Sequence, residues 1–375
     1  MKKLFLSLVF SFLILFLFTS GSMVYAEKSD ELPTPDSYIE SVLDELPSEV
    51  KEKIPVSDNY EDFVQTLDSG YLLSLSLSFF QKTLDTIYQY ITFFLTALIL
   101  GALAERIENT FIKQNLGVSS HIALLLIALE AVTIVYSLFQ NVAEYCKTIN
   151  GYMIAFTGVM ASVSLLGGGA VFASTSSTSL SFIVTILGSL CTVLLFPIIK
   201  LSFAAALTSI TSQRINLNSF SSFLRGFFTF LISFVSLISI VTITFQTKLA
   251  QAEDTLTARS LRFAASSSIP IVGNAVGDSV RTLGAAVSVI QKSVGTVGVV
   301  GLIIMTLYPL SLLFSAKIAF SLSQTVAKLL DVTSAEKLLC EVSSLINMLL
   351  ATVSILSVLY IFVTALFTNT AIPIL

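Results

Sequence analysis

The sequence is poor in charged residues, which make up only 12% of its 375 positions. Soluble globular proteins carry about 25% charged residues, so an ordinary water-soluble domain is excluded. Hydrophobic residues reach 54%, and this excludes a disordered chain, because disordered chains have few apolar residues. The class that remains is a polytopic membrane protein, whose apolar segments are surrounded by lipid.

Histidine and cysteine are scarce. With His121 as the only histidine, a histidine-based metal site and a Ser-His triad are both disfavoured. Cys146, Cys191 and Cys340 lie far apart, in or beside apolar runs. Free buried thiols therefore fit these residues better than a disulfide does.

Sequence motifs for catalysis are missing. The chain has no Gly-x-x-x-x-Gly-Lys-Ser/Thr loop, no His-Glu-x-x-His and no Gly-x-Ser-x-Gly elbow. Gly277-Asp278 matches the end of the Gly-x-Gly-Asp motif of intramembrane aspartyl proteases, but residue 275 is alanine and no second aspartate lies in another expected span. We therefore predict a protein that is not an enzyme and has no cofactor. No basic patch indicates nucleic acid as a partner.

Charge and hydropathy divide the chain into three parts. Residues 1–26 have the basic start, short apolar run and small residues near Ala26 that are typical of a cleaved signal peptide. Residues 27–85 hold 14 of the 24 acidic residues and only four basic ones. We expect them to form an acidic extracytoplasmic segment, followed by a multispan transmembrane helical domain over residues 86–375.

The acidic segment is expected to contain amphipathic helices. Ser37 to Leu46 and Asp58 to Leu67 each place apolar residues on one face, and Leu72 to Leu84 suits an interfacial helix. The segment is too small for a core of its own. It must therefore lie on the membrane, dock on the other segments or bind a partner.

The remainder of the chain predicts an all-α polytopic membrane protein. A span needs about 20 apolar residues, and about seven stretches satisfy this requirement. They are Thr86–Ala104, Ser120–Phe139, Ile149–Leu166, Leu180–Ile199, Phe223–Phe245, Val294–Ala316 and Val342–Phe367. Gly167 to Gly169 and Ser174 to Ser179 predict a flexible loop between the third and fourth spans. Seven spans would place the C-terminus in the cytoplasm.

Glu130 is the clearest ionisable residue inside an expected span. A charge in lipid is costly, so such a residue is a candidate for a polar path or a proton relay. The structural alternative is a carboxyl group that is protonated or hydrogen-bonded to a neighbouring helix. The second interpretation is favoured, because no other intramembrane acid or base is evident at matching depth.

A stripe of small residues precedes the sixth expected span. Its members fall on one helix face: Gly273, Gly277, Gly284 and Ser288. Asp278 and Arg281 are three residues apart and could pair on another face. The segment is either a re-entrant or pore-lining helix, or a packing helix at the interface. The small residues favour close packing.

Gly295, Gly298 and Gly301 continue this pattern at every third residue as the sixth span begins. Such spacing lets two helices cross closely. The three glycines are therefore candidates for helix packing or for lining a conduit.

The most distinctive residues form a run from 269 to 299. It contains Ile269-Pro270-Ile271-Val272-Gly273, then Asp278, then Lys292 followed by Ser-Val-Gly-Thr-Val-Gly-Val. Together with the signal peptide, the acidic segment and the Ser- and Phe-rich body, this run resembles the stage III sporulation protein AE family. Members of that family carry a similar proline-valine-glycine run, a following aspartate, and a lysine before a glycine-valine-glycine-valine span.

The resemblance implies a non-enzymatic membrane component of a secretion-like channel complex between mother cell and forespore, required for sporulation. It implies a multi-pass location in the mother-cell membrane around the forespore. The partners it implies are ring-forming proteins and a separate ATPase of the stage III complex, besides the lipid bilayer. The family has no established catalytic residues. A solute permease and a scaffold that only assembles the complex remain alternatives.

Overall fold

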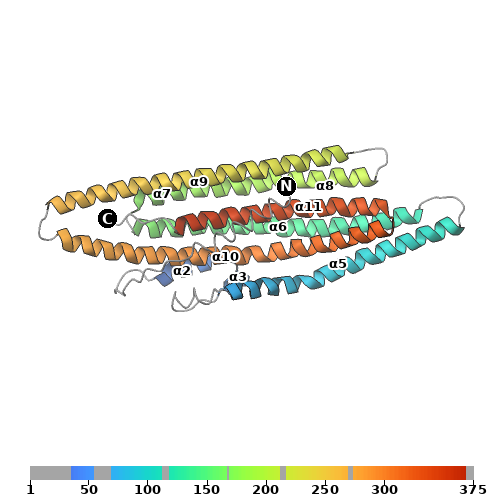
Figure 1. Cartoon of the computed structure of the whole chain (residues 1–375), viewed down its shortest axis with the longest axis horizontal. Helices are drawn as coiled ribbons and strands as arrows, with labels where there is room; N and C mark the ends of the chain where they lie inside the picture. Colours follow the sequence, from blue (N-terminus) through green and yellow to red (C-terminus); the bar gives the residue numbers. More distant parts are fainter. Residues whose placement is uncertain are drawn as a thin grey trace. The chain divides into compact units, whose positions relative to one another are not determined.

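The computed structural model describes residues 35–54, 69–111, 118–166, 169–211, 217–268 and 273–368, all of which belong to one compact unit, Pro35–Leu375. Within these residues the regular secondary structure is entirely helical, as Figure 1 shows. The expected signal peptide at residues 1–26 and the expected helix at residues 58–67 lie outside the described residues.

Two short helices precede a series of long ones. The short helices are α2 (Pro35–Asp44) and α3 (Ser48–Lys51). The long elements are α5 (Ser69–Phe111), α6 (Val118–Leu166), α7 (Ala170–Ser189), α8 (Phe196–Thr211), α9 (Asn218–Ser268), α10 (Gly273–Leu329) and α11 (Thr333–Thr368). A π-helical segment, η1 (Leu190–Leu195), joins α7 to α8 without interruption.

Six helical stretches of the described residues are long and apolar enough to cross a membrane. They are Leu73–Glu108, His121–Leu166, Leu180–Ile210, Asn218–Leu249, Val287–Leu329 and Thr333–Thr368. The prediction of an all-α multispan protein is confirmed, with six candidate spans where the sequence indicated about seven. The chain is therefore a multi-pass membrane protein by the length and composition of its helices.

The difference in span number arises in α6. This helix has 49 residues and a length of about 74 Å, and it unites the expected second and third spans. The polar residues between those spans had indicated a break. Instead, the Gln140 side chain donates a hydrogen bond to the Tyr136 hydroxyl at 2.8 Å, and the Asn141 amide donates to the Ser137 carbonyl oxygen at 2.9 Å. Since neither glycine-rich sequence nor proline intervenes, the helix continues.

Two other expected boundaries fall inside helices. The limit at residues 85 and 86, between acidic segment and transmembrane domain, lies within α5. The flexible loop expected at Ser174 to Ser179 is wrong, because these residues belong to α7. There the Thr178 hydroxyl donates to the Ser174 carbonyl oxygen at 2.8 Å. Such bonds within one helix satisfy the hydroxyl groups, so a serine-rich sequence remains helical.

The small-residue stripe belongs to the longest helix. α10 runs unbroken for 57 residues from Gly273, and Pro309 lies inside it. The stripe and the expected sixth span are therefore one continuous helix, and no re-entrant turn separates them within residues 273–329.

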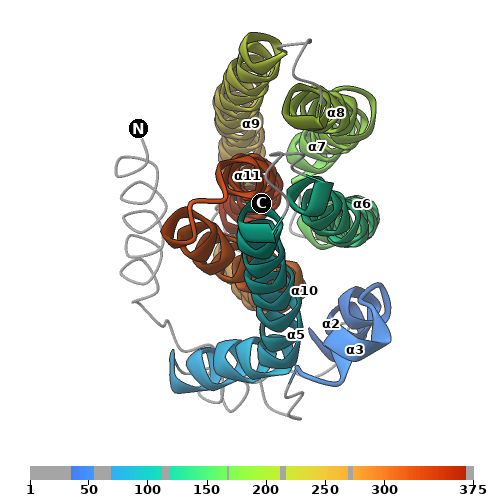
Figure 2. The same cartoon turned by 90° about the vertical axis from the view of Figure 1, so that its right-hand side faces the viewer.

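Helix α11 forms the centre of the bundle. It packs against α6, α8, α9 and α10, and Figure 2 shows it among these neighbours. Its largest buried side chains include Tyr360 and Phe367. α2 packs against α10 and α6, and its residues Val42 and Leu43 join the main apolar core. Of the three roles left open for the acidic segment, docking on the transmembrane body is the one that α2 adopts.

Candidate functional site

The glycines of α10 meet side chains from two other helices and from the segment after α2. A Cβ atom added to Gly295 would overlap Thr368 at the end of α11, and one added to Gly298 would overlap the Phe156 ring of α6. At Gly301 an added Cβ would lie 3.0 Å from Cδ2 of Leu46, which follows α2. The structure thus places these three candidates in close interhelical contacts, and side chains of the same chain fill the space beside each of them.

The α6 side of this junction is aromatic. The rings of Tyr152 and Phe156 stack with centroids 6.2 Å apart. The Tyr152 hydroxyl donates to the Gly298 carbonyl oxygen at 3.4 Å. Because Gly298 has no side chain, one ring covers its Cα while the neighbouring ring reaches its backbone.

A buried hydroxyl cluster joins the same helices farther along. Tyr145 of α6 lies 3.0 Å from the Thr306 hydroxyl of α10 and 2.5 Å from the Ser357 hydroxyl of α11. The Thr306 and Ser357 oxygens are 3.1 Å apart. Thr306 and Ser357 also donate to carbonyl oxygens of their own helices. Tyr145 can donate its one hydroxyl proton to either of them, so each hydroxyl has a partner and the cluster holds the three helices together.

A second polar contact lies one turn away. The Tyr360 hydroxyl donates to Oδ1 of Asn150. The Asn150 amide lies over Gly188, where an added Cβ would come within 2.5 Å of Nδ2. This contact fixes α6 between α7 and α11.

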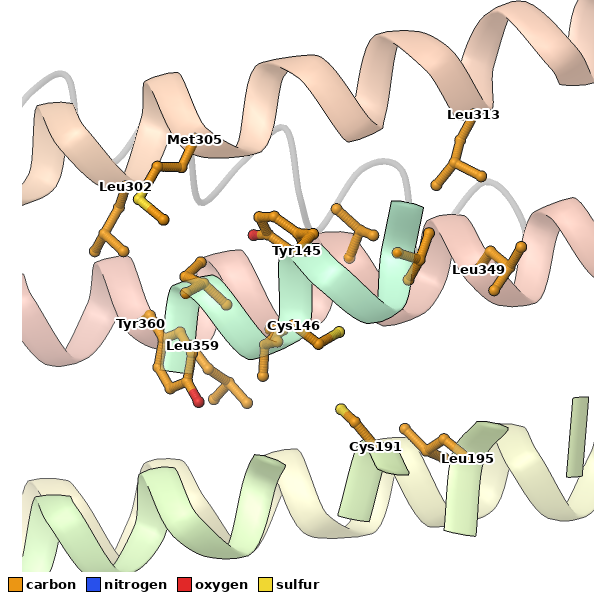
Figure 3. Packing of buried hydrophobic residues seen from close by; sticks show 14 of the residues in the cluster. Tyr145, Cys146, Cys191, Leu195, Leu302, Met305, Leu313, Leu349, Leu359 and Tyr360 are labelled. Atoms are coloured by element: carbon orange, nitrogen blue, oxygen red, sulfur yellow. The ribbon is translucent and has the colours of Figure 1, made fainter. Parts of the chain in front are cut away.

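Two of the three cysteines lie in this region. Cys146 of α6 and Cys191 of η1 are buried, and Figure 3 shows their side chains pointing toward each other. All three cysteines are free, as predicted, but Cys340 is exposed, contrary to the expected burial. Among the described residues, no three His, Cys, Asp or Glu side chains gather closely enough to hold a metal ion.

Glu130 is half-buried on α6 and lies away from the glycine contacts. It interacts electrostatically with Tyr90 of α5, which also interacts with Tyr308 of α10. Glu130 thus lies within electrostatic range of one phenol group on an adjacent helix, an arrangement that suits a packing role as well as a polar path.

The first part of the small-residue stripe has a described backbone only. Gly273, Gly277 and Gly284 lie in the first turns of α10, but the surroundings of residues 273–286 are outside the described part. The pairing of Asp278 with Arg281 therefore stays a prediction. Ser288 is half-buried on α10.

One ion pair was missed by the sequence reasoning. Nη1 of Arg225 on α9 lies 3.0 Å from Oε2 of Glu341 on α11, with 26% and 22% of the two side chains exposed. Arg225 was visible as a charge inside the expected fifth span. Its partner is 116 residues away in the sequence, so no local spacing indicated the pair.

These features define a class: an α-helical multi-pass membrane protein whose described helices are joined by packed side chains and hydrogen-bonded hydroxyls. The chain belongs to the stage III sporulation protein AE family, whose model matches residues 62–371. The family resemblance seen in the sequence is thereby confirmed, and membership implies a role in sporulation.

A curated relative is the stage III sporulation protein AE of Bacillus subtilis (strain 168). It is 23% identical over 236 residues, a match that covers 60% of this chain and 58% of the relative. The match thus spans less than two thirds of that protein's length. No solved structure matches the chain.

Proposed function

We propose that this protein is a non-enzymatic membrane component of a secretion-like channel complex in the mother-cell membrane around the forespore. Family membership over residues 62–371 is the observation that carries the proposal. A multi-pass body without a nucleotide-binding motif suits this role, because a separate ATPase would then provide the energy. Ring-forming proteins between the two membranes would be the other partners.

The packing of α10 supports a structural part in that complex. The spaces beside Gly295, Gly298 and Gly301 are occupied by Thr368, Phe156 and Leu46. A conduit wall needs a water-accessible surface, whereas these glycines face neighbouring helices. Any passage would therefore run between this protein and other subunits, not between α6, α10 and α11.

The docked acidic segment supports contact with extracytoplasmic partners. Glu40 and Asp44 of α2 are exposed, whereas Val42 and Leu43 are buried in the core. The apolar face of α2 thus anchors the segment to the membrane body. Its acidic face remains exposed for ring proteins in the intermembrane space.

Complementation in sporulating cells tests the proposal. We expect Glu130→Gln to support complex assembly and late forespore gene expression, since a channel component needs no proton relay at this residue. Co-purification with the ring proteins and the ATPase would report assembly, and a forespore reporter would report function. Glu144→Gln, the same change at an exposed position of the same helix, provides the control for a lost charge.

Loss of forespore expression in Glu130→Gln, with assembly and protein level intact, would favour a proton-coupled permease. Failure of the wild-type chain to co-purify with any other stage III protein would contradict the proposal itself.

A further inference from the structure

Helix α9 carries an aromatic row on an uncovered face. Its members, here called the phenylalanine ridge, recur at intervals of three and four residues: Phe220, Phe223, Phe227, Phe230 and Phe234. Between 41% and 65% of each residue is exposed, so no described helix covers them. Alternating intervals of three and four keep a row on one helix face and match the seam of a left-handed helix pair.

A row of small residues lies beside the ridge. Each ridge residue directly follows one member of this small-residue groove: Ser219, Ser222, Gly226, Thr229 and Ser233. All five are exposed. A Cβ atom added to Gly226 would find no heavy atom within 4 Å, whereas the same addition at Gly298 would overlap a neighbouring helix. No side chain of the described residues therefore fills the groove at Gly226.

Lipid contact alone does not explain the two rows. Near the start of α6, its outer face exposes aliphatic side chains, including Ile122, Leu125 and Leu129, without an adjoining row of small residues. Lipid requires only an apolar surface of this kind. A row of Ser, Gly and Thr lowers helix propensity, but it lets a second backbone approach closely. The α9 face thus has the features of a helix contact.

The opposite face of α9 fixes the helix to its own chain. The Ser221 hydroxyl lies 3.1 Å from the Ser202 hydroxyl of α8, and Arg225 pairs with Glu341 of α11. Arg225 is the only charged residue between Asn218 and Thr247. Because it is held on the inner side, the ridge and the groove form an uncharged surface, and two such surfaces do not repel each other.

We propose that the phenylalanine ridge and the small-residue groove form a self-association surface on which a second copy of this chain docks. Two copies in one membrane have the same orientation, so a two-fold axis along the membrane normal relates them and their α9 helices run parallel. Such a rotation places the ridge of one copy opposite the groove of the other at the same level. A self-complementary surface of this type is what a two-fold dimer requires.

The area of the surface is sufficient for a stable contact. At about 200 Å² for a fully exposed ring, the five ridge residues present roughly 500 Å². The same face continues through Leu237, Val241 and Phe245, which are 60% to 68% exposed and add roughly 400 Å² on the same scale. The total reaches the 800 Å² or so that each partner buries in a standard interface.

This inference does not rest on the channel role, and the full-length chain in membranes and in detergent micelles tests it. We would use the full-length chain carrying Cys340→Ser, which removes the exposed thiol and keeps the two buried ones. Ser233→Cys then places one reactive thiol in the groove. Ser137→Cys, at an exposed position of α6, is the matched control. Membranes are treated with a short bismaleimide, and the mass of the product is measured.

We expect covalent dimers from Ser233→Cys and none above background from Ser137→Cys. Adding Gly226→Leu should raise the dissociation constant of the dimer in detergent micelles about tenfold, because leucine fills the groove. Gly158→Leu, at another exposed glycine with free space around its Cα, should leave the constant unchanged. Both leucine variants should keep the thermal stability of the parent, which separates lost association from misfolding.

Three results would overturn the proposal. One is equal cross-linking at residues 233 and 137, which indicates a lipid-facing surface with random encounters. The second is a dimer that forms equally well with Gly226→Leu. The third is a cross-linked product whose mass indicates a different protein, since the surface would then serve a heterologous partner.

Discussion

Helices α9 and α10 both carry rows of small residues, but only one row is occupied. In α10, Gly295, Gly298 and Gly301 are filled by side chains of α11, α6 and the segment after α2. In α9, the small-residue groove is exposed, and Gly226 has free space around it. A row of small residues therefore indicates a close neighbour without telling whether that neighbour belongs to the same chain. The structure makes this distinction, and substitutions can test it.

The largest effect is expected at Gly298. Gly298→Leu forces a side chain into the Phe156 ring, and overpacking of this kind costs about 3 kcal/mol. We expect a large loss of thermal stability or no folded protein in detergent. Gly226→Leu, with the same change on the empty row, should leave the stability of the monomer unaffected. Thermal unfolding of both variants, followed by size-exclusion chromatography, provides the measurement.

A rescue experiment identifies the clash. Gly298→Ala should be destabilising alone but should cost little when it is added to Phe156→Ala, where the ring no longer occupies the space of the new methyl group. If Gly298→Ala is as stable as the parent protein, the two helices are not in the close contact that the structure shows.

The ion pair of α9 gives the next largest effect. Glu341→Leu removes the partner of a partly buried arginine, and we expect a loss of about 2 kcal/mol, less than for a fully buried pair. Replacing both residues, with Arg225→Met and Glu341→Leu, should restore most of this stability, because no charge is then left unpaired. The pair holds the inner face of α9. Weaker self-association of Glu341→Leu would show that the ion pair also positions the outer face of α9 for the second copy.

The ion-pair experiment needs a measurement of each property. Unfolding in detergent reports the stability, and cross-linking through Ser233→Cys reports the dimer. A double variant that is as unstable as Glu341→Leu alone would show that packing, not charge pairing, makes the contact important.

The sequence predicted composition-driven features well and long-range features poorly. The helical membrane class and the helix near residues 37–46 follow from local patterns, whereas the choice between packing and conduit lining at Gly298 was left open by the sequence. The continuity of α6 does not, because Gln140 and Asn141 are polar in sequence but bond within the helix. Arg225 and Glu341 meet only after the chain folds, so no local spacing could identify them.

The smallest effect is expected from single hydroxyl groups. It differs between the buried hydroxyl cluster, which contacts α10, and the exposed face of α9. Tyr145→Phe removes a hydroxyl that bridges α10 and α11, and a loss of about 1 kcal/mol is expected. Thr306 and Ser357 keep bonds to their own helices, which limits the cost. Thr229→Val on α9 removes a hydroxyl that bonds only to the Arg225 carbonyl oxygen of the same helix, so monomer stability should not fall. Equal destabilisation of both variants in thermal unfolding would mean that the hydroxyl of Thr229 also has a partner within the chain, and the contrast between an occupied α10 and an empty α9 would be lost.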